Sequence, residues 1–156
     1  MLPLPAISLI ASDYPRLERL ARVAAQQGDM DAGFLMVEIN RAGIVPDDAQ
    51  GVKSIVTIGS WVTYWTNWGF PRKTVQLVWP EDLTSDLAQI SVLSPLGAAL
   101  IGLHVGDQMP YFVAGCMNVV RVERVSRSGP NVIRLAAPHR IRTCDLDDPD
   151  PGPTVA

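Results

Sequence analysis

The spacing of apolar residues changes once along this chain, and that change constrains the fold more than any single motif does. Up to about residue 45, apolar residues recur at intervals of three and four, which is typical of amphipathic helices. From Ser54 onward, short runs rich in aromatic and β-branched side chains alternate with polar residues, as they do in strands. Helices followed by a run of strands predict an α+β fold.

A helical hairpin is predicted for residues 6–45. Ser12 or Asp13 can cap its first helix, and a turn follows at Gly28. The second helix should run from about residue 31 to residue 42, where a glycine ends it. Helices of this length span about 20 Å at a rise of 1.5 Å per residue. The sequence therefore predicts a short arm.

A strand-rich domain is predicted for residues 52–126. Its strands are expected at residues 55–68, 73–80, 89–94 and 118–125, with turns between them that contain glycine, proline and asparagine. A further strand can follow residue 107. We predict four or five antiparallel strands.

A short helix is predicted between the third of these strands and the last. Ser94 is a good N-cap residue, and a proline fits the first position of the helix. The next residues are small, so the helix can lie close against a sheet, and the strands should curl around it. Seven residues of this segment are predicted to have structural roles: Ser94, Pro95, Gly97, Ala98, Gly102, Gly106 and Asp107.

The overall composition is that of a soluble globular protein, with 47% hydrophobic and 19% charged residues. No apolar run approaches the length of about 18 residues that a membrane span needs. The N-terminus lacks the basic segment of an export signal, so we expect a cytoplasmic protein with reduced thiols. The cysteines and histidines show no zinc-ligand spacing, and we expect no metal site on them: Cys116, Cys144, His104 and His139.

The net charge of −3 hides an asymmetry near the C-terminus. Residues 143–156 carry four aspartates and no lysine or arginine, whereas residues 121–142 carry six arginines and one acid. Without residues 143–156 the chain has 12 acidic and 13 basic side chains. This part of the chain has almost no net positive charge and should attract phosphate groups only weakly, so we expect no specific nucleic-acid binding. Residues 127–156 are predicted to be a basic stretch followed by a disordered acidic tail.

The segment ISVLSPLGAALIGLHVGDQM, at residues 90–109, resembles the C-terminal domain of the Gre transcript-cleavage factors. It is more similar still to the Rnk branch of that family, the regulators of nucleoside diphosphate kinase. The stretch ISLIASDYPRLERL, from residue 7 to residue 20, resembles the same branch, and the likeness covers roughly residues 6–126. It implies a coiled-coil arm joined to an FKBP-like domain, in a bacterial protein that docks on RNA polymerase at its secondary channel.

The arm tip carries two acids, Asp29 and Asp31. In Gre factors, two acids at the arm tip help to hold a catalytic Mg²⁺, which prefers carboxylate oxygens. Here the acids lack the Gre spacing and the helices are shorter, and aspartates at such positions are also common turn and N-cap residues. We therefore expect a competitor of Gre factors without cleavage activity, with no catalytic residue and no cofactor.

An alternative function follows from the FKBP-like fold, which prolyl isomerases share. An isomerase or peptide-binding module needs an aromatic pocket, for which the candidates are Trp61, Tyr64, Trp65, Trp68 and Trp79. Aromatic residues at strand spacing also serve as core packing, and a fold alone does not fix a function. The chain has no Gly-rich phosphate loop, so we expect no kinase activity of its own.

Overall fold

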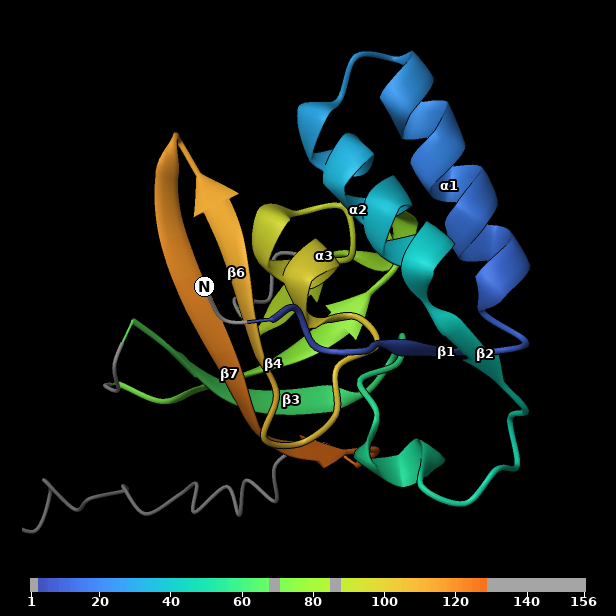
Figure 1. The fold of residues 1–156 in the computed structure, drawn as a ribbon, viewed down its shortest axis with the longest axis vertical. Coiled ribbons are helices and arrows are strands. Elements are labelled where there is room, and N and C mark those ends of the chain that lie inside the picture. Colours follow the sequence, from blue (N-terminus) through green and yellow to red (C-terminus); the bar gives the residue numbers. More distant parts are fainter. Residues whose placement is uncertain (1–2, 68–70, 85–87, 129–156) are drawn as a thin grey trace, which may run out of the picture.

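The computed structural model describes residues 3–67, 71–84 and 88–128 (Figure 1). Two helices precede a curled sheet with one short helix in its concave side, which confirms the predicted α+β class. Within the described ranges, no helix has the length and hydropathy of a membrane span. Three sets of predictions lie outside the described residues: those for Trp68, for His139 and Cys144, and for the tail beyond residue 128.

The predicted helical hairpin is formed by α1 (Tyr14–Gln26) and α2 (Met30–Arg41). Its two helices bury small and branched side chains against each other. These are Leu17, Ala21 and Ala24 of α1 and Ala32, Leu35 and Ile39 of α2. The pattern follows the helical period, since residues three and four apart share one face.

Two short strands were not predicted, and they fasten the base of the hairpin. Strand β1 (Ser8–Ile10) pairs in parallel with β2 (Gly43–Val45), so that the chain entering the arm lies beside the chain leaving it. The helix ends at Arg41, so Gly43 begins a strand and does not itself end the helix. A hydrogen bond of 3.0 Å from the Ser8 N–H to the Gly102 carbonyl ties β1 to the rest of the fold.

The main sheet has five strands in the order β5-β4-β3-β7-β6. Their bounds are β3 Trp61–Thr66, β4 Lys73–Val78, β5 Gln89–Ser91, β6 Gln108–Val113 and β7 Cys116–Ser126. All neighbours are antiparallel except β4 and β5, which are parallel, so the prediction of a wholly antiparallel sheet is wrong at β5. The connection between these two strands contains the short 3₁₀ helix η2 (Pro80–Asp82), and β5 then begins with Gln89 opposite Gln76 of β4.

The predicted strand at 55–68 is shorter in the structure, because β3 begins only at Trp61. The 3₁₀ helix η1 (Val52–Ser54) and a turn precede it. In this turn Gly59 has a φ of 91°, and the Ser60 hydroxyl donates to the Thr57 carbonyl at 2.7 Å. Val56 is nevertheless fully buried, which explains why the segment has the apolar pattern of a strand.

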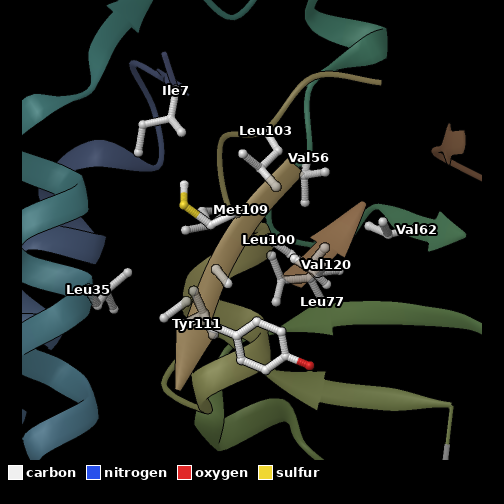
Figure 2. Packing of buried hydrophobic residues seen from close by; sticks show 14 of the residues in the cluster. Ile7, Leu35, Val56, Val62, Leu77, Leu100, Leu103, Met109, Tyr111 and Val120 are labelled. Atoms are coloured by element: carbon white, nitrogen blue, oxygen red, sulfur yellow. The ribbon is translucent and has the colours of Figure 1, made fainter. Parts of the chain in front are cut away.

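Helix α3 (Pro95–Leu100) lies against the concave face of the sheet and contributes to the buried hydrophobic core. Figure 2 shows Leu100 and Leu103 among Val56, Leu77 and Val120. The same buried cluster includes residues of the arm, among them Leu17, Leu35 and Ile39. The arm therefore shares its core with the strand-rich part, while the boundaries of two domains at 6–45 and 52–126 stay a prediction.

Candidate docking surface

A groove lies between the arm and the strand-rich part, at the end of the molecule where the α1–α2 turn and the β6–β7 turn are found (Figure 1). Its volume is about 330 Å³. One wall is the start of α2, the other is the end of β6 with its turn, and the start of α3 completes the lining. The lining residues are Met30, Asp31, Phe34, Pro95, Tyr111, Phe112, Ala114 and Gly115.

The second wall is the end of the β6–β7 hairpin, which has a very tight turn. Val113 and Cys116 are the last paired residues, so that only Ala114 and Gly115 connect the strands. Both have positive φ angles, of 51° and 80°, as a two-residue hairpin turn of type I′ requires. The turn thereby brings the apolar residues of both strands to the tip.

Large apolar side chains are exposed around this groove. Met30 at the start of α2 is 90% exposed and Phe112 of β6 is 60% exposed. Met117, which is 64% exposed, lies opposite Phe112 on β7. A single exposed apolar residue is ordinary, but a group of them beside a groove is typical of an interaction surface.

The residues predicted to be structural around α3 lie at its N-cap, in its first turn and against the sheet. The Ser94 hydroxyl accepts from the Gly97 N–H at 3.0 Å and donates to the Ser91 carbonyl at 2.6 Å, which caps the helix. Pro95 occupies the first helical position, and Ala98 is buried against the sheet. A short, tightly packed helix results.

The remaining residues of this motif shape the turns after α3. Gly102 has a φ of 81° and is packed against β1, where an added Cβ atom would lie 3.1 Å from the Ser8 carbonyl oxygen. Gly106 has a φ of 95° in the turn before β6. Asp107 closes this turn by accepting from the His104 N–H at 2.9 Å. All three are explained by backbone geometry.

The two arm-tip acids have different environments. Asp29 is the N-cap of α2, and its carboxylate accepts from the Asp31 N–H at 2.9 Å and the Ala32 N–H at 3.3 Å. Asp31 lies in the first helical turn and lines the groove. The described residues contain no group of three or more His, Cys, Asp or Glu side chains that could hold a metal ion. The geometry of Asp29 is that of a capping residue.

The aromatic residues proposed for a peptide pocket do not come together. Tyr64 and Trp79 are buried in the core, whereas Trp61 and Trp65 alternate with Tyr64 and point to the opposite face of the sheet. Two of the rings have an arginine guanidinium over one face: Arg121 lies over Trp65, and Arg16 lies over Trp79. Tyr64 and Trp79 therefore belong to the core packing, and the rings of Trp65 and Trp79 make cation–π contacts.

The comparisons with known proteins cover up to about three quarters of the chain. The sequence model of the family described as "Transcription elongation factor, GreA/GreB, C-term" matches residues 51–127. The chain is 31% identical over 123 residues to the "Regulator of nucleoside diphosphate kinase" of Escherichia coli (strain K12), which covers 76% of this chain and 90% of that protein. The chain belongs to the Rnk branch of the Gre family. The Rnk protein of Shigella flexneri matches to the same extent.

A solved structure of this family supports the fold. The prokaryotic transcription elongation factor GreA/GreB from Nitrosomonas europaea aligns with a TM-score of 0.62 and 29% identity, over 77% of this chain and 98% of that chain. These relatives of the Rnk and Gre type are named as regulators or elongation factors and not as catalysts. The sequence alone did not reveal the groove, because its walls come from residues about 80 positions apart.

Proposed function

We propose that this chain is an RNA polymerase-binding transcription regulator of the Gre/Rnk type. It docks at the secondary channel, in the cytoplasm, and competes with Gre factors without stimulating transcript cleavage. The observation that carries the proposal is the apolar groove with exposed Met30 and Phe112, in a chain whose relatives are transcription factors. Burial of exposed aromatic and methionine side chains is a common source of binding energy in protein interfaces.

The lack of cleavage activity is supported by the arm. Helix α1 has 13 residues and α2 has 12, so each spans about 20 Å. The Asp29 carboxylate is already engaged by two backbone N–H groups. A carboxylate must lie within about 2.1 Å of Mg²⁺ to bind it. A short arm whose tip acid serves as a cap is poorly suited to deliver that ligand to a distant metal.

The alternative of a prolyl isomerase or peptide-binding module receives less support. It needs aromatic side chains that converge on one concave site. Tyr64 and Trp79 are in the core, and Trp61 and Trp65 lie on the other face of the sheet. The groove does bring together three other aromatic residues, Phe34, Tyr111 and Phe112, and we assign these to the docking surface described above.

Binding to purified core RNA polymerase tests the proposal. We expect the full chain to be retained by the polymerase and to be displaced by an excess of a Gre factor. Phe112→Thr should weaken binding by about tenfold or more, because it removes an exposed aromatic contact and keeps a strand-forming residue. The matched control is Val105→Thr, an exposed apolar residue away from the groove that should leave binding unchanged. Failure of the polymerase to retain the wild-type chain would refute the proposal.

A further inference from the structure

We infer that the arm tip belongs to the same docking surface as the β6–β7 hairpin. Both then contact one segment of the polymerase, whose apolar side chains are flanked by lysine or arginine. In this arrangement the arm stays at the docking site and does not reach into the channel. The identity of the partner rests on the proposed function, but the shape of the surface does not. Three features of the molecule carry the inference.

The first feature is the fixed position of the arm. Strand β1 pairs with β2 in parallel at the base of the hairpin, with the Gly43 N–H donating to the Ile7 carbonyl at 2.9 Å. On α2, Leu35 and Ile39 are fully buried in the core that the sheet also forms, and Figure 2 shows Leu35 beside the cluster around Met109. Swinging the arm outward would expose these apolar side chains to water, which is unfavourable. The arm tip therefore stays beside the hairpin.

The second feature is that the two walls are apolar in the same place. Met30 and Phe34 are four residues apart on α2 and so lie on one face of the helix, above Tyr111 and Phe112 of β6. Met30 on the arm side is 90% exposed and Phe112 on the hairpin side is 60% exposed. A partner that buries Phe112 would therefore also meet Met30. A groove of about 330 Å³ has room for one or two apolar side chains.

The third feature is the charge at the groove. Asp31 is the only charged side chain among the described residues that line it. It forms no ion pair with another residue in the described part of the chain. A negative charge at the edge of an apolar groove favours a segment whose apolar side chains are flanked by lysine or arginine. The occupant that fits is thus an apolar protein segment with a basic neighbour.

Site-specific cross-linking in the complex with core RNA polymerase tests the shared surface. A photoreactive benzophenone amino acid is placed at Met30, at Phe112 and, as a control, at Val23, an exposed apolar position on α1 that does not line the groove. We expect the adducts from positions 30 and 112 to map to the same polymerase peptide and position 23 to give none with it. An adduct from position 30 on a different polymerase element, or none when position 112 cross-links, would overturn this inference alone. Absence of any complex would overturn the proposed function as well.

Binding affinities give a second, independent readout. Met30→Gln keeps a straight-chain helix former and should weaken binding by about fivefold to tenfold, whereas Val23→Gln should not change it. Asp31→Asn should reduce the dependence of affinity on salt concentration, and Asp48→Asn, an exposed loop aspartate, serves as its control. If Met30→Gln binds like the wild type while Phe112→Thr loses affinity, the arm is not part of the surface.

Discussion

A Cβ atom placed on Gly97 would lie 2.0 Å from the carbonyl oxygen of Ser91. This is far inside the contact distance of two non-bonded atoms, and the obstructing atom belongs to the backbone. The close approach is possible because Gly97 has no side chain. The Ser94 hydroxyl donates to the same Ser91 carbonyl at 2.6 Å and so joins the strand to the helix at this point. The start of α3, which lines the groove, is positioned by this contact.

Gly97→Ala should therefore destabilise the fold by about 3 kcal/mol, because either α3 or β5 must shift to admit the methyl group. The control is Gly33→Ala on α2, where an added Cβ atom would meet nothing within 4 Å. That change should stabilise by about 0.5–1 kcal/mol, since alanine favours a helix over glycine. Urea unfolding of both variants measures the difference, and equal stabilities would contradict the packing of α3.

The helices of this protein could be predicted from local signals. Leu17 and Ala21 follow the helical period, and Ser94 and Pro95 mark the start of α3 as a cap and a first-turn proline. The small residues after Pro95 correctly indicated a helix packed close to a sheet. Such signals lie within a few residues of one another, and a sequence displays them directly.

The pairing of strands could not be predicted in the same way. Strands β1 and β2 have three residues each, which is too short for a recognisable period, and Ser8 finds its partner 35 residues away at Gly43. The direction of β5 relative to β4 is set by the path of the connection and not by the side-chain pattern. The groove has the same origin, because Met30 and Phe112 become neighbours only when the hairpin is fastened against the sheet.

The β6–β7 turn is strained at one residue, since Ala114 has a φ of 51°. A left-handed conformation costs an alanine about 1 kcal/mol relative to residues that tolerate it, such as asparagine. Ala114→Asn should thus raise the free energy of unfolding by about 0.5–1 kcal/mol, which urea unfolding can measure. The reverse test is Gly115→Ala. Gly115 has a φ of 80° and open surroundings, so this variant should lose about 1 kcal/mol of unfolding free energy through backbone strain alone.

Two aspartates at the base of the arm, Asp13 and Asp47, should make the stability of the fold depend on pH in opposite directions. Burial raises the pKa of Asp13, and the nearby Asp47 carboxylate raises it further, against a lowering by the Ile58 N–H. Ionisation of Asp13 is therefore less favourable in the folded chain, and stability falls as pH rises above its ordinary value of 3.8. Asp13→Asn should raise the melting temperature at pH 7, and the gain should disappear near pH 3.

The pKa of Asp47 is lowered because it accepts hydrogen bonds from Ser12, whose N–H lies 3.0 Å away. Its contribution to stability is present at neutral pH and is lost as pH falls below 3.8. Asp47→Asn, made in the Asp13→Asn background so that the repulsion between the two does not offset it, should lower the melting temperature at pH 7. A shift of the same sign for both substitutions would contradict these assignments.

The capping role of Asp29 leads to a prediction about transcript cleavage. Asp29→Asn keeps an N-cap acceptor and should leave stability nearly unchanged, whereas Asp29→Ala should lose about 1 kcal/mol of unfolding free energy, because the Asp31 and Ala32 N–H groups lose their acceptor. We expect an excess of the wild-type chain to bind a backtracked elongation complex without shortening its RNA, and Asp29→Asn to behave identically. If the wild type shortens the RNA, and Asp29→Asn or Asp31→Asn abolishes this while binding persists, then the arm tip does reach the catalytic metal and the competitor function is wrong.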